Sequence, residues 1–529
     1  MHRAALLLAA LLAACQVPTD GARCDSDSNC PSGQACGNDR TCSARAAACA
    51  ATRCAPGATR CGTQGAVERC TDADKTCGTW TAEPCAAGLS CGALSGAHAC
   101  ECLPAEGGIL VADPAAGSAL PYATGRDSPA QCRFARLGDA LAAATPGTTV
   151  RAAGAPPGGT VAFSKSAGET LPLTIPAGVT LTSDAATGGG RYVVRMDDPA
   201  APAAIRLQSS ATLSAVDVEN VAVGETGVAL VLDCATSDPI HLDSVALDGR
   251  GNGAQLGSGL VVDGQCGVVA TGVDIAGMKS DGVAIRAATG GVANTFTGGS
   301  VTACGRGVYL KTGALRLDGV RVQGNAGFGV EAGALTGDSA LELVGARVLG
   351  NGDSGVVLLN NRELVVSGTT VFGNAAVTVW GGASTPSGVS RLAGGIVLRG
   401  PPPQPGTGGA VTFQFERNRV YANKGDQVLV LGSSSEWHLT GLGCGYATDG
   451  SPKFNVFACY DASAQPSGVT GRGLVVVDAS ADASSIAWQN VTPTADFMNY
   501  GTGATIDVGN NLFCAPDPKL DCASPDPKP

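Results

Sequence analysis

Charged and aromatic side chains that could recognise an acidic sugar recur at one position of a repeated phrase. The phrase is glycine, an apolar residue, any residue and a second apolar residue, and it begins at Gly259, Gly282, Gly307, Gly329 and Gly355. The position directly after it holds Asp263, Arg286 and Lys311 in the first three copies. Stacked cations recognise carboxylates through charge-assisted hydrogen bonds. Tyr309, and Trp380 further along the same position, would offer flat faces to sugar rings.

The same residues suggest cleavage as an alternative to binding. A polysaccharide lyase would use Arg286 or Lys311 as its base, together with a cluster of acidic Ca²⁺ ligands. The nearby acids Asp263, Asp281 and Glu331 are scattered rather than grouped, and an exposed cation does not lose its proton readily. A solvated charge stripe without any ligand is the third interpretation. We therefore expect binding without turnover, with no cofactor and no metal.

A second phrase tells which elements position these residues. It reads Gly319-Val-Arg-Val-Gln-Gly-Asn325, and similar copies begin at Gly272, Gly298, Gly345 and Gly368. The starting glycines are 26, 21, 26 and 23 residues apart, a period typical of stacked supersecondary units. Alternating apolar residues with Gly and Asn turns indicate short strands. The pattern predicts coils of a parallel β-helix with at least two strands each and alternate residues pointing inward.

Asparagines occupy one turn position of this phrase. They are Asn325, Asn351, Asn374 and Asn423, and Cys304 holds the same position one coil earlier. Asn tolerates left-handed backbone and can bond to like neighbours along a stack. We expect a structural ladder of asparagines and a buried free thiol at Cys304.

Composition excludes several function classes. The chain has 529 residues, 76 glycines, 4% aromatic residues and a net charge of −11. The negative charge argues against a nucleic-acid partner. Only four histidines occur, and none lies between residues 242 and 437, which argues against a histidine metal site or a Ser-His-Asp triad. A monomer is expected.

The first residues predict export and a lipid anchor. Met1-His2-Arg3 is basic, residues 4–11 are apolar, and Leu12-Ala-Ala-Cys15 follows. The run is too short for a membrane span and is typical of a signal peptide over residues 1–14. Its end resembles the bacterial lipobox, which implies cleavage before Cys15 and lipidation of that thiol. An ordinary signal peptide is the alternative. Residues 15–23 would be the tether, and the location would be the outer membrane or cell surface.

Thirteen cysteines crowd into residues 24–102. In an exported chain this density predicts small disulfide-bonded modules. Zinc is the rival, but no Cys-x-x-Cys pair occurs there. Among the later cysteines we expect three pairs: Cys234 with Cys266, Cys444 with Cys459, and Cys514 with Cys522. Cys132 would pair with Cys100 or Cys102.

The segment before the coils carries a resemblance to a known family. A strand at 108–113 precedes an Ala- and Leu-rich stretch with helical spacing at 134–144, and strands follow at 147–150, 171–175 and 176–181. This order resembles bacterial surface lipoproteins of a domain-of-unknown-function family with a right-handed parallel β-helix of the pectate-lyase-like fold. The resemblance covers roughly residues 108–513 and implies fold and location, because the family has no assigned activity.

The predicted fold class is all-β. It is a right-handed parallel β-helix (a single-stranded solenoid) over residues 103–513 with an N-terminal cap helix, after a disulfide-rich region at 24–102 and before a tail at 514–529. The predicted function is a lipid-anchored surface protein that is structural or binds acidic envelope or matrix polysaccharide. The alternative is a polysaccharide lyase.

Overall fold

A computed structural model describes most of residues 133–374, with gaps, and shorter stretches within 23–113 and 394–514, together with Ser524. The chain divides into two compact units. One comprises Met1–Val111 with Ala115–Ala135, and the other comprises Ala112–Pro114 with Arg136–Pro529. Among the described residues, no helix is both long enough and apolar enough to cross a bilayer.

One coil of the second unit shows the plan of the stack. It contains β27 (Gly313–Asp318), β28 (Arg321–Gln323) and β29 (Val330–Ala332). Each strand pairs in parallel with its counterpart in the next coil, as in Leu315 with Leu341 and Val330 with Val356. The bend between β27 and β28 contains Gly319 with φ +66°, a backbone conformation that glycine adopts without strain. The coil therefore has three strands, and the predicted two correspond to β28 and β29.

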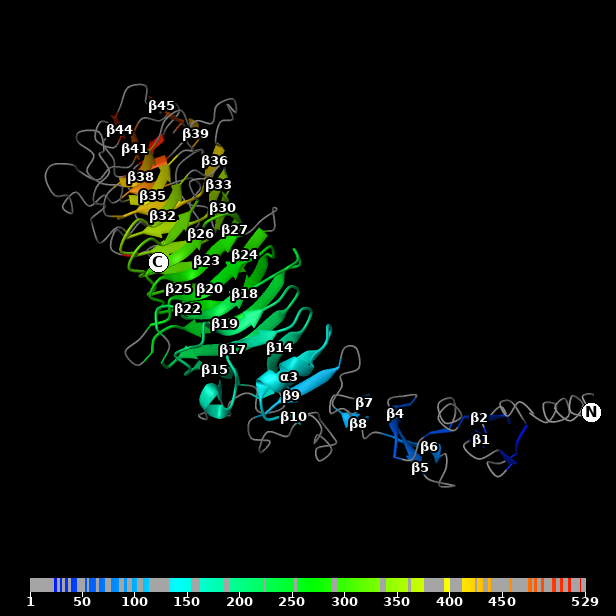
Figure 1. The fold of residues 1–529 in the computed structure, drawn as a ribbon. Coiled ribbons are helices and arrows are strands. Elements are labelled where there is room, and N and C mark those ends of the chain that lie inside the picture. The colour runs from blue at the N-terminus through cyan, green and yellow to red at the C-terminus, as the bar shows by residue number, and fades with distance from the viewer. Residues whose placement is uncertain are drawn as a thin grey trace, which may run out of the picture. The chain divides into compact units, whose positions relative to one another are not determined.

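The stacked strands form two large sheets and a short third one (Figure 1). The 12-stranded sheet contains β13 (Leu173–Ile175), β16 (Ala203–Leu207), β18 (Val228–Leu232), β20 (Ser258–Asp263), β23 (Asp281–Ala287), β26 (Arg306–Leu310), β29, β32 (Val356–Leu359), β35 (Gly394–Arg399), β38 (Asp426–Leu431), β41 (Leu474–Val477) and β44 (Phe497–Tyr500). The short sheet contains β39 (Glu436–His438), β42 (Ser480–Asp482) and β45 (Thr505–Asp507).

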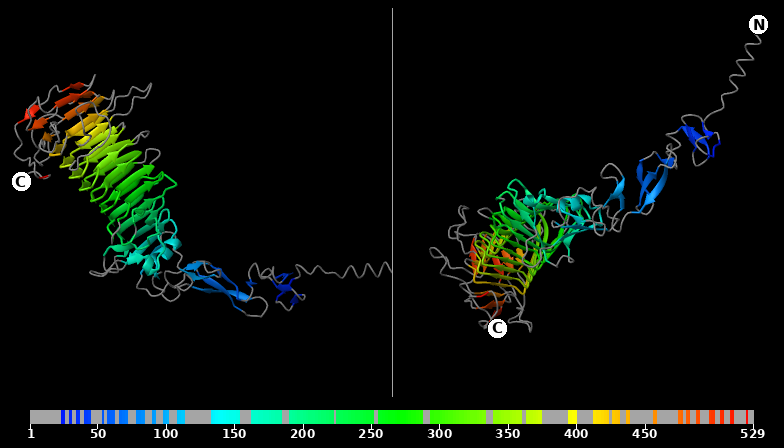
Figure 2. Two further views of the ribbon diagram at one scale, coloured as in Figure 1. Left: turned by 60° about the vertical axis from the view of Figure 1, so that its left-hand side comes forward. Right: turned by 90° about the horizontal axis from the view of Figure 1, so that it is seen from below.

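The longer sheet carries the first two strands of each coil. Its strands include β11 (Thr149–Ala153), β12 (Ala162–Ser164), β14 (Thr180–Asp184), β15 (Tyr192–Met196), β17 (Thr212–Asn220), β19 (Ile240–Asp248), β21 (Val268–Thr271), β22 (Asp274–Ala276), β24 (Ala293–Thr297), β25 (Ser300–Thr302), β27, β28, β30 (Ser339–Val344), β31 (Arg347–Leu349), β33 (Glu363–Ser367), β34 (Thr370–Phe372), β36 (Thr412–Glu416), β37 (Arg419–Tyr421), β40 (Val456–Ala458), β43 (Ala487–Gln489) and β46 (Leu512–Cys514). Figure 2 shows the same stack of parallel strands from two further sides.

The core lies inside the coils, where equivalent residues stack on one another. Val322, Val348 and Val371 are in direct register and fully buried. In β30, buried and half-buried residues alternate along the strand, as a strand with one buried face requires. Burial of these aliphatic columns stabilises each coil only when its neighbours are present.

The asparagines form a buried ladder at one bend. The Nδ2 of Asn325, Asn351 and Asn374 each donates to the Oδ1 of the next asparagine along the stack, at 2.8, 2.8 and 2.9 Å. The lower end accepts from the backbone N–H of Cys304 at 2.9 Å. A Cβ added at Gly355 would lie 2.8 Å from the Nδ2 of Asn374, so the ladder explains the glycine of the first phrase.

A short helix covers the first coils. Helix α3 (Leu137–Ala143) buries Leu137, Ala140 and Leu141, within the stretch predicted to be helical. The 3-10 helix η5 (Lys165–Ala167) follows β12. The carboxylate of Glu169 accepts hydrogen bonds from the backbone N–H groups of Leu137 at 2.6 Å and Gly138 at 2.9 Å. It thereby satisfies two donors that a helix leaves free at its start.

The first unit consists of small sheets held by disulfides. The strands of these small sheets are β1 (Gln34–Cys36), β2 (Cys42–Ala44), β3 (Arg53–Cys54), β4 (Thr59–Cys61), β5 (Val67–Thr71), β6 (Gly78–Glu83), β7 (Ser90–Gly92) and β8 (Ala99–Glu101). The chain also forms β9 (Ile109–Ala112) and β10 (Arg133–Phe134), which are not part of these small sheets. The disulfides join Cys24 to Cys36, Cys30 to Cys42, Cys54 to Cys70, and Cys61 to Cys91. The disulfide-rich region expected from the cysteine density is therefore confirmed.

Candidate functional site

Four of the five predicted ligand-binding residues, Asp263, Arg286, Tyr309 and Lys311, lie in or directly after β20, β23 and β26. Val308 and Leu310 of β26 point into the core and are almost fully buried, whereas Tyr309 between them is half-buried on the outside. In register, Tyr309 lies between Ala284 of β23 and Glu331 of β29. Lys311 follows Leu310 and is exposed, so Tyr309 and Lys311 emerge on the same face.

Arg286 and Lys311 are neighbours in adjacent coils, as predicted from the phrase. Ile285 is in register with Leu310, and the backbone N–H of Lys311 donates to the carbonyl of Ile285 at 2.8 Å. Both side chains are exposed. Within the part of the chain that the structure describes, neither forms an ion pair. The backbones that carry these two cations thus lie about 4.8 Å apart along the stack.

Asp263 does not continue this column. A β-bulge between Val262 and Asp263 shifts the register, so that Asp263 is paired with Ala287 instead of Arg286. One extra residue on β23 therefore has no partner on β20, and Arg286 is not in register with Asp263. The predicted stack of Asp263, Arg286 and Lys311 is therefore wrong, and only the pair Arg286 and Lys311 remains. The sequence did not reveal the bulge because the repeated phrase has the same length in every copy.

An ion-pair cluster that the sequence analysis did not identify lies beside the cations. The Nε of Arg306 donates to Asp281 at 2.8 Å, and its Nη1 donates to Glu331. The guanidinium carbon lies 3.7 Å from the ring centroid of Tyr309, within the range of a cation–π contact. The side chains of Arg306, Asp281 and Glu331 are 27%, 8% and 15% exposed. Solvent therefore screens this cluster less than it screens Arg286 and Lys311.

Arg306 is held in its charged form. Burial acts to lower the pKa of the Arg306 guanidinium, but the hydrogen bonds and charges of Asp281 and Glu331 outweigh it and raise that pKa. Arg306 therefore cannot act as a base, and the two carboxylates that the sequence left scattered are bound to one cation. Asp281 and Arg306 each precede the glycine of a phrase and are in register. The residue before the glycine of each phrase could therefore have predicted this ion pair from the sequence.

The remaining predicted residues fall into two groups. Cys234 and Cys266 form a disulfide between coils, and Cys304 is a buried free thiol. Trp380, Cys15, Cys132, Cys444, Cys459 and Cys522 lie outside the described residues, and Cys514 is in β46 with no described side-chain environment. The sulfurs of Cys24, Cys30 and Cys36 lie within 4.8 Å of one another, but all three belong to disulfides, so these sulfurs are not thiolate ligands.

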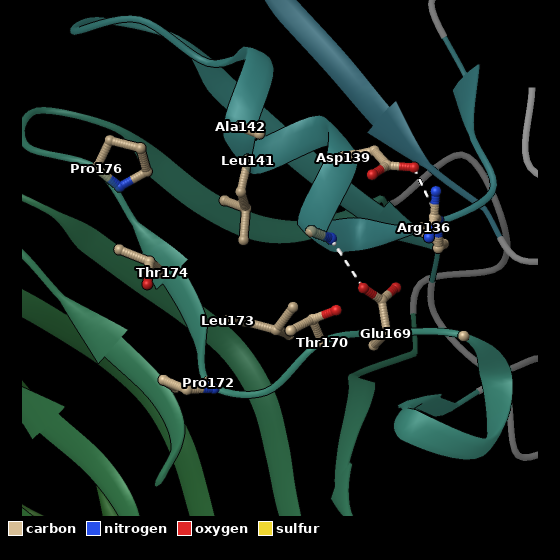
Figure 3. Close-up of a pocket in the computed structure, with 12 residues that line it drawn as sticks. Arg136, Asp139, Leu141, Ala142, Glu169, Thr170, Pro172, Leu173, Thr174 and Pro176 are labelled. Carbon is tan, nitrogen blue, oxygen red and sulfur yellow. Dashed lines mark hydrogen bonds and ion pairs between the residues drawn. The ribbon is translucent and has the colours of Figure 1, made fainter. Parts of the chain in front are cut away.

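A cleft of about 420 Å³ lies between α3 and the segment from Gly168 to Pro176 (Figure 3). Its charged groups already have partners: Arg136 bonds to Asp139 at 2.9 Å, and Glu169 caps the helix. Burial raises the pKa of the Glu169 carboxyl, and the bonds from Gly138 and Leu137 act against that rise. The cleft is part of the cap, and the charged side chains among the described residues that line it are all engaged with partners.

Comparisons with known proteins agree with the stacked geometry. The family described as "Right handed beta helix region" matches residues 242–389. No curated protein shows significant sequence similarity to the chain. The fold is a right-handed parallel β-helix, preceded by a disulfide-rich region.

Three similar solved structures are of different kinds. An alginate lyase from Paenibacillus sp. str. FPU-7 is 14% identical, with 71% of this chain and 95% of that chain covered and a TM-score of 0.33. The A-module of a mannuronan C-5 epimerase from Azotobacter vinelandii is 15% identical, with 65% and 92% covered and a TM-score of 0.35. Tailspike protein 3 of bacteriophage CBA120 is 12% identical, with 71% and 58% covered and a TM-score of 0.36.

Proposed function

We propose that this is an exported, lipid-anchored protein whose β-helix binds anionic polysaccharide, without turnover, on the outward face of β23 and β26. The proposal rests on a contrast between two groups of charged side chains on this face, one engaged in ion pairs within the protein and the other exposed. The carboxylates of Asp281 and Glu331 are both ion-paired with Arg306, so both are engaged within the protein. Arg286 and Lys311 are exposed, and their charges are available to a ligand. The carboxylates of an acidic glycan chain would bind these two cations.

The geometry favours binding over the lyase alternative. A Lys or Arg base must be desolvated before the neutral form becomes accessible, and both Arg286 and Lys311 are exposed. Calcium-assisted cleavage needs several free oxygen ligands, and Asp281 and Glu331 are both held by Arg306. Two exposed cations and one aromatic ring on this face are sufficient to bind an anionic sugar chain weakly and in a salt-sensitive way.

Calorimetric titration with a panel of polyuronates at low and high salt tests the proposal. We expect the double variant Arg286→Ala plus Lys311→Ala to bind roughly tenfold more weakly at low salt, because each exposed ion pair contributes under about 1 kcal/mol. The charge-matched control is Arg206→Ala plus Lys279→Ala, which removes two exposed cations already paired with Asp233 and Glu225. That control should retain binding.

Two outcomes would overturn this assignment. Equal affinity of the double variant and the native chain would remove the cation pair as the site. Appearance of unsaturated-sugar absorbance during the titration would replace binding without turnover by the lyase activity. Attachment through a lipid at Cys15, an outer-membrane or cell-surface location and a monomeric state complete the proposal.

A further inference from the structure

An acidic side chain without a partner lies at one end of the cation pair. Asp263 is exposed, and in the described part of the chain it forms neither a hydrogen bond nor an ion pair. It directly follows the fully buried Val262 and is in register with Ala287, the residue after Arg286. Adjacent coils lie about 4.8 Å apart, and Lys311 follows one coil beyond Arg286. Along these three described coils, an unpaired acid therefore precedes two unpaired cations.

The coil before Asp263 carries an acid at the same place. Leu232 is in register with Val262, and Asp233 and Asp263 are the residues that follow them. Asp233 bonds to Arg206 at 3.2 Å, and its side chain is 56% exposed. From β18 to β26 the outward residues at the strand ends are therefore acidic, acidic, cationic and cationic. The sign of the charge at these positions changes between β20 and β23.

The loops that carry the two acids are joined covalently. Cys234 directly follows Asp233 and forms a disulfide with Cys266, three residues after Asp263. The two backbones also approach closely, because a Cβ added to Gly264 would lie 2.9 Å from the backbone nitrogen and oxygen of Cys234. The backbone at Asp263 is thus held in place before a ligand arrives, which lowers the entropic cost of a contact with its carboxylate.

The sequence of charges discriminates between kinds of anionic chain. A polymer with a carboxylate on every sugar, bound to the two cations and running along the stack, would bring a further carboxylate beside Asp263. At physiological ionic strength such charges repel each other within about 8 Å. A protonated amine at the same place would instead form a charge-assisted hydrogen bond with the free carboxylate. Repulsion of one ligand and attraction of the other act together to give specificity.

We propose that Asp263 determines the charge pattern of the ligand, and that this face selects a glycan with both carboxylates and free amino groups. The carboxylates bind Arg286 and Lys311, and a protonated amine of the same chain binds Asp263. A uniform polyuronate is then a weaker ligand, held by the two cations alone. This inference rests on the polysaccharide-binding function proposed above and names the class of glycan that the same site takes.

Calorimetric titration at low salt with two matched oligosaccharides tests this selectivity. One is a fragment of alternating uronate and glucosamine with free amines, and the other is the same fragment after N-acetylation, which keeps every carboxylate. We expect the native chain to bind the free-amine fragment roughly two- to fivefold more tightly, the range of one exposed ion pair. Asp263→Asn, an isosteric change at an exposed position, should bind both fragments equally. Asp243→Asn removes an exposed acid from the longer sheet and should keep the native preference.

The double variant Arg286→Ala plus Lys311→Ala separates this inference from the function on which it rests. Equal binding of both fragments by the native chain, or an amine preference that survives Asp263→Asn, overturns the role of Asp263. Loss of the preference in Asp243→Asn also overturns it, because net charge would then be the cause. In each of these cases the polysaccharide site still stands if the double variant binds both fragments more weakly. If neither fragment binds, or if the double variant binds them as the native chain does, the proposed function fails and this inference fails with it.

Discussion

At the residue scale, the asparagine ladder is visible in the sequence and contributes to the free energy of unfolding. Asn351 donates through Nδ2 to Asn374 and accepts from Asn325, and it is fully buried. Each amide also donates to a backbone carbonyl of the coil below, as Asn351 does to Val322 at 3.3 Å. Loss of one amide leaves buried donors and acceptors in two neighbouring coils without partners, which is more costly than the loss of one exposed hydrogen bond.

The first prediction concerns Asn351→Ala. We expect the free energy of unfolding to fall by about 3 kcal/mol, because one variant leaves polar groups of Asn325 and Asn374 unsatisfied in the core. Denaturant titration followed by circular dichroism measures the change. Thr295→Ala, at an outward half-buried position of β24, is the control and should change stability by under about 0.5 kcal/mol. Equal effects of the two variants would contradict a stabilising ladder.

The second prediction concerns the thiol of Cys304. Burial raises its pKa to about 11, although hydrogen bonds at the backbone of Met278 and Gly277 act against the rise. Thiolates are the reactive form, so an alkylating reagent at pH 8 should miss Cys304 in the native chain and label it after denaturation. Mass spectrometry of the labelled peptide measures this. Native labelling at the rate of a free thiol would show that the coil opens there.

The same shift has a consequence for stability. The folded-state pKa lies above the unfolded value of about 8.5, so the protonated thiol favours the folded state fully below that pH. This contribution is lost as the pH rises toward 11. Cys304→Ser should therefore flatten the alkaline decline in unfolding free energy between these two values.

At the element scale, the repeated phrases predict strands β28, β29 and their counterparts because glycine and asparagine mark both bends. The phrase beginning at Gly319 gives the inward Val322, and the phrase beginning at Gly329 gives the inward Val330. Strand β27 and its counterparts vary in sequence and have no fixed turn residues, so the pattern left them out. Local spacing is sufficient to identify elements whose turns require a particular residue type.

The candidate site was less predictable than the strands. The neighbours Arg286 and Lys311 followed from the phrase, because equal spacing preserves register between coils. The bulge at Asp263 and the ion pairs of Arg306 did not follow, because both depend on how two strands align and not on one strand's pattern. The contact between Tyr421 and Ser524 spans 103 residues, and no local signal in either segment announces it.

The third prediction concerns the disulfide-rich unit as an element. Its strands are short, and the disulfides are needed because a Cys-dense region of under 80 residues buries little apolar surface. Reduction under native conditions should make residues 24–102 sensitive to protease while the β-helix stays intact, as judged by fragment masses. The unreduced chain is the control. Protease resistance of this region after complete reduction would show that forces other than disulfides hold it.

At the scale of the whole molecule, stacking makes each coil depend on its neighbours, whereas the small sheets of the first unit depend on covalent links. In a solenoid, stability is a sum over repeats and the interfaces between them, so a cap such as α3 covers apolar surface that stacking alone would leave exposed at the end of the stack. A protein built in this way presents long, regular columns of side chains. Two neighbouring cations on adjacent coils could bind successive carboxylates of one polymeric ligand, which strengthens binding relative to a ligand with a single carboxylate.

The last prediction concerns attachment to the membrane. The sequence Leu12-Ala-Ala-Cys15 predicts cleavage before Cys15 and lipidation of its thiol. Several acyl chains together hold a protein at a bilayer far better than one, because each buried CH₂ contributes about 0.8 kcal/mol. Intact-mass analysis of the membrane fraction should therefore show a chain that begins at a lipid-modified Cys15, and Cys15→Ser should move the protein to the soluble fraction. Cys304→Ser is the matched control and should stay membrane-bound. Recovery of the native chain in the soluble fraction with an unmodified Cys15 would contradict the lipid anchor, and the proposed polysaccharide-binding face would then belong to an exported protein without an anchor.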